Sequence, residues 1–142
     1  MIQRIQTIWL LAAAVFAFAG LRFPFFTGNL IQIKDGLSTQ TLVSVDGFSS
    51  FYITTLTIAI GVISSIVIFL YKNRGLQIRL SILGILLELG TVYLYYKETL
   101  TLNQGTYALS SLLQVGVLSF LFLAIKGISK DNKIIRESNS LR

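Results

Sequence analysis

The chain has 142 residues, of which 54% are hydrophobic and only 13% are charged, and its net charge is +6. Because soluble domains carry about 25% charged residues, this composition excludes an ordinary water-soluble globular domain and predicts a membrane protein. The chain contains no cysteine and no histidine, which excludes disulfides, zinc–thiolate sites, haem ligation by either residue, and Ser–His or Cys–His nucleophilic pairs.

The first apolar segment covers residues 5–21 and is long enough for one transmembrane helix. The same stretch resembles a secretory signal, because Arg4 precedes an apolar run that ends in Ala17-Phe18-Ala19, an A-x-A cleavage pattern. A secretory signal normally starts with a clearly basic region, whereas this one has a single arginine. We therefore expect a retained helix rather than a cleaved signal.

Residues 22–50 form a long connection, predicted to be a periplasmic loop, that contains two alternating stretches. NLIQIK at 29–34 and TQTLVSV at 39–45 alternate polar and apolar side chains, and DGLS separates them. Alternation on both sides of a Gly-containing turn predicts a small β-hairpin. Since an isolated two-stranded hairpin is only marginally stable in water, we expect it to pack on helix ends, on lipid or on a partner.

Three more apolar segments follow, at residues 51–71, 78–96 and 106–125. At 1.5 Å per residue each reaches roughly 28 to 32 Å, about one hydrocarbon core. In lipid every backbone N–H and C=O group must be satisfied within the protein, so we expect helices. Short connections make neighbouring helices antiparallel. We therefore predict an all-α membrane protein, with residues 1–142 as a single domain that forms a four-transmembrane-helix antiparallel bundle.

The distribution of positive charge predicts the orientation. If the chain crosses the membrane four times, nine of the 12 lysines and arginines fall on the side of the termini, and Arg22, Lys34 and Lys97 fall on the other. Because positive residues concentrate on the cytoplasmic side, we expect a multi-pass protein of the bacterial inner membrane with both termini cytoplasmic. The basic tail at 126–142 favours membrane lipids as partners, and nothing in it would stack nucleic-acid bases.

One carboxylate, Glu88, lies in the middle of the third apolar segment, within LGILLELG at 83–90. An ionised acid at this depth costs at least about 2.5–3.5 kcal/mol on insertion scales. We therefore expect a protonated Glu88 in an intramembrane polar contact with Gln114 of the fourth span, or with a hydroxyl such as Thr57 or Ser64. The alternative is that Glu88 is a proton or cation site.

A set of polar residues is predicted on the cytoplasmic side, in the N-terminal segment, the connection after the second span and the tail. Amides and cations are mixed there, which offers directional hydrogen bonds as well as charge. We expect a docking surface for another protein, with anchoring to lipid headgroups as the alternative. Its members are Gln3, Arg4, Gln6, Arg74, Gln77, Arg79, Lys130 and Arg136.

Three stretches carry a resemblance to a known family: MIQRIQT at 1–7, YKNRGLQIRL at 71–80 and KDNKIIRESNSLR at 130–142. Together they are similar to a family of short four-span bacterial inner-membrane proteins that carries a domain-of-unknown-function label. The resemblance covers essentially the full length and implies a four-helix membrane protein from Gram-negative bacteria. It implies no activity and supplies no catalytic residues.

Several features favour a non-enzymatic accessory or scaffold subunit of an envelope complex. The chain is small, its polar cytoplasmic side suits docking, and sequence spacing brings no two acids together, so we predict no catalytic residue, metal site or cofactor. The partner would be another membrane protein or further copies of this chain. The alternative is a small proton-coupled transporter that uses Glu88, since an intramembrane acid often marks an ion or proton pathway.

Overall fold

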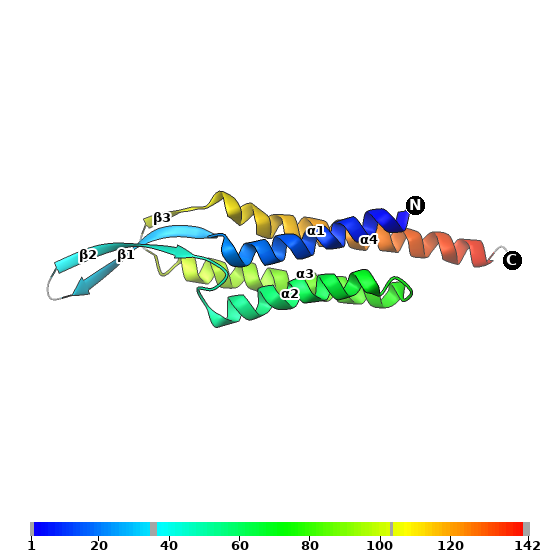
Figure 1. Ribbon diagram of the computed structural model, residues 1–142, viewed down its shortest axis with the longest axis horizontal. Helices are drawn as coiled ribbons and strands as arrows, with labels where there is room; N and C mark the ends of the chain where they lie inside the picture. Colours follow the sequence, from blue (N-terminus) through cyan, green and yellow to red (C-terminus); the bar gives the residue numbers. More distant parts are fainter. Residues whose placement is uncertain (1, 35–36, 103, 141–142) are drawn as a thin grey trace.

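A computed structural model describes the backbone of residues 2–34, 37–102 and 104–140, and the side chains of residues 5–30, 41–102 and 105–134. Four α-helices lie side by side, and a small antiparallel sheet extends from one end of them (Figure 1). In chain order the elements are α1 (Ile2–Arg22), β1 (Phe26–Lys34), β2 (Leu37–Val45), α2 (Phe51–Phe69), α3 (Arg74–Thr99), β3 (Gln104–Tyr107), the 3₁₀ turn η1 (Leu109–Ser111) and α4 (Leu112–Ser140).

The four α-helices are long and apolar enough to cross a membrane, as judged by length and composition. They contain 21, 19, 26 and 29 residues, so their lengths range from roughly 28 to 44 Å. The predicted helices at 5–21, 51–71 and 78–96 are confirmed as α1, α2 and α3, with ends that differ by a few residues. A helix end shifts easily because the first and last turns lack intrahelical partners.

The predicted fourth span, residues 106–125, starts too early and ends too soon. Thr106 and Tyr107 belong to β3, which pairs with β1, and α4 begins only at Leu112. Pairing with β1 satisfies backbone hydrogen bonds of this segment, so it does not need to be helical. At its other end α4 continues through the basic tail to Ser140, since no proline interrupts this part of the chain.

The helices form an antiparallel bundle in which each packs on two neighbours. α1 contacts α2 and α4, and α3 contacts the same two helices. Buried positions recur at alternating intervals of three and four residues, the heptad spacing of left-handed bundles. The apolar core consists of Leu10, Ala13, Ala17, Ile60, Val67, Val117, Leu121 and Ala124.

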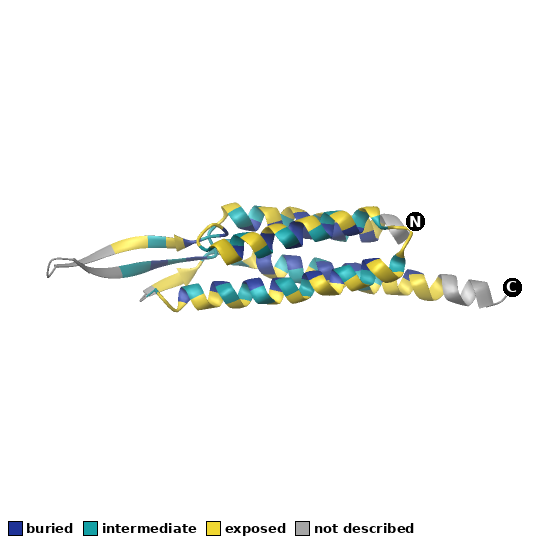
Figure 2. Cartoon of the chain, turned by 90° about the horizontal axis from the view of Figure 1, so that it is seen from below, coloured by how far each residue is buried: buried dark blue, intermediate teal, exposed yellow. Residues whose placement is uncertain are grey.

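The outer faces of the helices are apolar, whereas part of the interior is polar. Leu86, Leu89 and Phe122 are each more than half exposed, and Figure 2 shows exposed residues along the outside of the bundle. Lipid tails solvate apolar side chains, so this distribution fits helices that cross a membrane. The buried face of α3 has no aliphatic side chain, and consists of Gln77, Ser81, Gly84, Glu88, Thr91, Tyr95 and Thr99.

The predicted β-hairpin is confirmed, and a third strand joins it. β1 pairs with β2 from Phe26 opposite Val45 to Lys34 opposite Leu37. β3 pairs with the other edge of β1 as far as Asn29, so the strand order is β2-β1-β3. The outer part of the hairpin is therefore two-stranded, and Figure 1 shows it extending away from the helices.

Aromatic side chains fix the base of the sheet to the helix ends. Phe25 stacks on Tyr95 of α3 with ring centroids 4.5 Å apart, and Tyr107 of β3 meets Phe26 at 5.1 Å. Phe26, Val45 and Tyr95 belong to one buried cluster. Offset and edge-to-face ring pairs are favourable beyond the area they bury, so the sheet begins from a rigid base.

Candidate functional site

Polar side chains line the interior of the bundle, and they come from all four helices. The heptad packing that forms the apolar core also brings these groups together. They fall into two regions, one around Glu88 in the middle of the bundle and one at the end where both termini lie. Their buried members are Gln6, Thr57, Ser64, Gln77, Ser81, Glu88, Thr91, Gln114 and Asp131; one more buried polar residue, Thr99, lies apart from both regions at the end of α3.

Glu88 is 1% exposed, and neither of its carboxyl oxygens has a hydrogen-bond partner in the described part of the chain. The Thr57 hydroxyl donates to the Ile53 carbonyl at 2.8 Å instead, and the Ser64 hydroxyl has no hydrogen-bond partner within the described ranges. The hydrogen bond predicted between Glu88 and a neighbouring hydroxyl is therefore not formed. A buried polar atom without a partner costs about 1–3 kcal/mol, so packing alone does not explain Glu88.

The hydrogen bond predicted between Glu88 and Gln114 is also absent. Gln114 is 4% exposed, and its Oε1 has no hydrogen-bond partner among the residues that the structure describes. Its Nε2 lies beside α1, 3.0 Å from where a Cβ would stand on Gly20. Gly84 packs on Leu121, and in antiparallel helices this register sets Glu88 about one turn away from Gln114. The prediction assumed that Glu88 and Gln114 lie at the same depth in the membrane. Because α4 begins only at Leu112, Gln114 lies near the start of its helix rather than near the middle.

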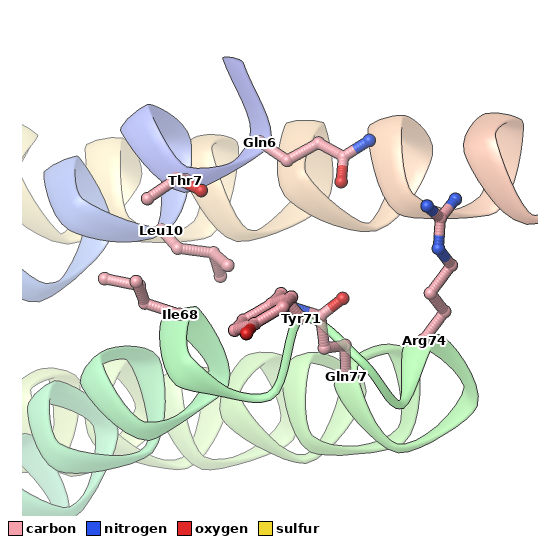
Figure 3. Close-up of a pocket in the computed structure, with 7 residues that line it drawn as sticks. All are labelled: Gln6, Thr7, Leu10, Ile68, Tyr71, Arg74 and Gln77. Atoms are coloured by element: carbon pink, nitrogen blue, oxygen red, sulfur yellow. The ribbon is translucent and has the colours of Figure 1, made fainter. Parts of the chain in front are cut away.

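A pocket of about 220 Å³ lies at the end of the bundle where both termini are, and we call it the terminal pocket. Its walls come from α1, from the end of α2 and the turn after it, and from the start of α3 (Figure 3). The residues that line it are Gln6, Thr7, Leu10, Ile68, Tyr71, Arg74 and Gln77.

Three of the predicted cytoplasmic residues meet in the terminal pocket. Gln77 donates from Nε2 to the Val67 carbonyl at 2.9 Å, which ties the start of α3 to the end of α2. Arg74 Nη1 lies 3.5 Å from Asp131 Oδ2 of α4. Gln6 Nε2 is buried and has no hydrogen-bond partner among the described residues. Figure 3 shows the Gln6 amide and the Arg74 guanidinium extending toward the same end of the pocket.

The prediction of one exposed polar surface is partly wrong. Gln6 and Gln77 are only 7% and 6% exposed, because they occupy heptad positions inside the bundle. Arg79 and Lys130 are exposed and do not line the pocket. The remaining predicted members, whose side chains lie outside the described ones, are Gln3, Arg4 and Arg136.

Asp131 and Tyr71 are site residues that the predicted set of cytoplasmic residues does not include. Asp131 is 7% exposed and continues the buried spacing of Ala124 and Ile128 along α4. An acid at a core-spaced position of an otherwise basic tail was the signal that could have found it. Tyr71 follows the end of α2. Its place in the pocket depends on the turn between α2 and α3, and no sequence pattern predicts how that turn orients it.

The two regions differ in the ligands that their side chains suit. The terminal pocket offers a guanidinium and an amide N–H, which hydrogen-bond oxyanions. The Glu88 region offers carboxyl oxygens, which suit a proton or a small cation. Within the described ranges, no group of three or more His, Cys, Asp or Glu could hold a metal ion.

Comparison with known proteins identifies a family. The sequence matches the model of a family described as a domain of unknown function (DUF4293) over residues 2–141. No curated protein and no solved structure matches the chain. The geometry of the two regions and of the sheet is therefore the basis for any statement of function.

Proposed function

This chain belongs to the DUF4293 family of unknown function, and from that premise we propose that it is a non-enzymatic accessory or scaffold subunit of a membrane complex. We place it in the bacterial inner membrane, with both termini in the cytoplasm and the sheet in the periplasm. The observation that carries the proposal is the β1–β2 hairpin, which extends well beyond the helix ends (Figure 1).

The outer half of the hairpin needs support that the described residues do not supply. Beyond Asn29, β1 pairs with β2 alone, and a two-stranded ribbon is at best marginally stable in water. The free edge of β2, LSTQTLVSV, carries no charge and no proline, although proteins usually protect exposed edges with such residues. Leu42 on this strand is 81% exposed. These features favour a partner that adds a strand to the hairpin or packs on it.

The distribution of charge supports the proposed orientation. Both termini lie at the end of the bundle opposite the sheet (Figure 1). At the sheet end the described cations are Arg22 and Lys97. Since positive residues concentrate on the cytoplasmic side, the more basic end favours cytoplasmic termini. The described cations at the end of the termini are Lys72, Arg74, Arg79, Lys126, Lys130 and Lys133.

The test is affinity purification of the full chain from native membranes in mild detergent, with identification of the co-purifying proteins. The double variant Thr41→Lys, Leu42→Lys places charge on the free edge strand. The matched control, Leu100→Lys, Thr101→Lys, changes the same two residue types at exposed positions after α3. We expect the wild type and the control to retain a second protein that the edge variant loses.

The same purification can also overturn the accessory role. If the wild-type chain co-purifies only with itself, as a single protomer or a homo-oligomer, it is not a subunit of a larger complex. Equal retention of the second protein by the edge variant and the wild type would show that the hairpin edge does not dock it.

A second function, a small proton-coupled transporter, is favoured by the Glu88 carboxyl in the middle of the bundle, which forms no hydrogen bond with any described residue. The test is ethidium uptake into proteoliposomes driven by a pH gradient. Glu98→Gln, at the end of α3, is the matched control for Glu88→Gln. Uptake that disappears only in Glu88→Gln would favour transport, whereas the absence of pH-driven uptake by the wild type would exclude it for this class of cation.

A further inference from the structure

The terminal pocket changes from apolar to polar along the bundle axis. Leu10 and Ile68 line the part nearer the middle of the bundle, and Gln6 and Arg74 line the part nearer the termini (Figure 3). Tyr71 is 58% exposed, so the pocket is open to the surroundings of the bundle at this rim. A ligand with an apolar portion and a charged portion therefore fits this pocket better than a wholly polar one.

Two buried donors in the polar part of the pocket form no hydrogen bond within the described part of the chain. They are Gln6 Nε2 and Arg74 Nη1, and the latter makes only the ion pair with Asp131 Oδ2 at 3.5 Å. The amide of Gln77, in contrast, already donates to the Val67 carbonyl. Because a buried donor without a hydrogen bond is costly, these two groups point to a ligand that carries acceptor oxygens.

We propose that the terminal pocket binds the phosphate group of an anionic phospholipid. Phosphate oxygens accept hydrogen bonds from a guanidinium and from an amide, which are the donors that Arg74 and Gln6 present. Ile68, which is half-buried, is placed to contact the apolar part of the lipid next to its headgroup, and Leu10 of the buried core closes the pocket behind it. Lys72, exposed in the turn before α3, adds positive charge that attracts anionic headgroups. The inference is independent of the accessory role, since a lipid site can serve any membrane protein.

Asp131 competes with phosphate for Arg74. Its carboxylate lies on one side of the guanidinium, but a guanidinium has five N–H donors and one carboxylate cannot use them all. The guanidinium can therefore donate to a phosphate as well as to Asp131, while the negative charge of Asp131 weakens the attraction. Neutralising Asp131 should therefore strengthen phosphate binding, which is the opposite of the effect of losing Arg74.

The test uses the full chain in mild detergent, with its thermal unfolding midpoint measured as phosphatidylglycerol is added to the micelles. Phosphatidylcholine, which has no net charge, is the comparison lipid. A ligand that binds only the folded state raises the midpoint by mass action, so the titration yields an apparent affinity. We expect stabilisation by phosphatidylglycerol and much less by phosphatidylcholine. Arg74→Gln should lower the apparent affinity about tenfold, and Gln6→Leu should lower it as well.

Arg79→Gln is the matched control, because it removes the same charge from an exposed position on the same helix. It should leave the affinity unchanged. Asp131→Asn should raise the affinity, and this variant keeps the proposal testable if Arg74→Gln does not fold. Equal losses in Arg79→Gln and Arg74→Gln would mean general charge attraction and overturn the site. A weaker or unchanged affinity in Asp131→Asn would also overturn it.

Free phosphate shares the chemistry of the lipid headgroup, so a separate titration distinguishes the two. Inorganic phosphate is added to the lipid-free protein in place of phosphatidylglycerol. We expect no comparable rise in the midpoint, because free phosphate has no apolar part that could contact Ile68. A rise as large as that caused by phosphatidylglycerol, and lost in Arg74→Gln, would reassign the pocket to free phosphate and overturn the lipid assignment.

Discussion

Arg74, the first residue of α3, forms an ion pair with Asp131 of α4, with Nη1 and Oδ2 3.5 Å apart. The two side chains are 19% and 9% exposed, so water screens their attraction less than it screens a surface pair. The pair joins two neighbouring helices at the end of the bundle that also holds the terminal pocket. It therefore contributes to packing, and in the proposed lipid site it competes with phosphate for Arg74.

Breaking this pair should weaken the bundle. We expect Arg74→Gln and Asp131→Asn each to lower the free energy of unfolding by about 1–3 kcal/mol, because each leaves a mostly buried charge without its partner. The double variant should lose less than the two single losses combined, since both remove the same interaction. Unfolding in lipid-free detergent measures all three, and strictly additive losses would contradict the pairing.

Gly47, in the connection between β2 and α2, should not tolerate a side chain. A Cβ there would stand 2.5 Å from Leu21 Cα and 3.0 Å from the Gly20 carbonyl oxygen, and backbone atoms cannot rotate away as a side chain can. We expect Gly47→Ala to lower stability by about 1–3 kcal/mol. Gly90→Ala on α3 is the control, since nothing lies within 4 Å of its added Cβ. Thermal unfolding should show it to be neutral or slightly stabilising.

Tyr95 should matter for its ring rather than for its hydroxyl. The ring is fully buried and stacks on Phe25, whereas the hydroxyl has no hydrogen-bond partner among the described residues. We expect Tyr95→Phe to be neutral or stabilising, because it removes only an unsatisfied group. Tyr95→Ala should cost about 3–5 kcal/mol through the cavity it leaves. A large loss of stability in Tyr95→Phe would reveal a partner for the hydroxyl.

Glu88→Leu tests whether the Glu88 carboxyl contributes to the stability of the bundle. Leucine keeps a similar volume and removes two buried oxygens that have no partner in the described part of the chain. We expect the variant to be more stable than the wild type by about 1–3 kcal/mol. Unfolding of Glu88→Leu and of the wild type in the same detergent gives the comparison. A clear loss of stability would mean that Glu88 has a polar partner after all.

The proposed orientation can be tested by cysteine labelling, because the chain contains no cysteine of its own. Ser49→Cys lies at the sheet end, and Asn132→Cys lies on α4 near the termini; both positions are exposed. A membrane-impermeant maleimide reaching the periplasm of intact cells should label Ser49→Cys and should label Asn132→Cys only after the inner membrane is opened. The reverse pattern would place the termini in the periplasm.

The third strand and the burial of two glutamines could not be predicted from local patterns. β3 forms because residues 104–107 pair with residues 26–29, and no local alternation marks so short a strand. Gln6 and Gln77 are polar residues near helix ends, which favours exposure, yet both are buried. Their burial follows from the register between helices: Gln6 packs against Gly127, and Gln77 reaches back to the Val67 carbonyl.

Hydropathy and side-chain alternation alone were sufficient to predict four helices and one hairpin. Both patterns report whether a local segment prefers lipid, water or the half-buried face of a sheet, and that preference is a property of neighbouring residues. Only the tertiary structure decided which polar groups share the interior and which of them find partners. Helix register, set by contacts such as Gly84 on Leu121, leaves Glu88 without a hydrogen bond to the described residues and places Arg74 beside Asp131. The reason is that packing joins residues that are far apart in the chain.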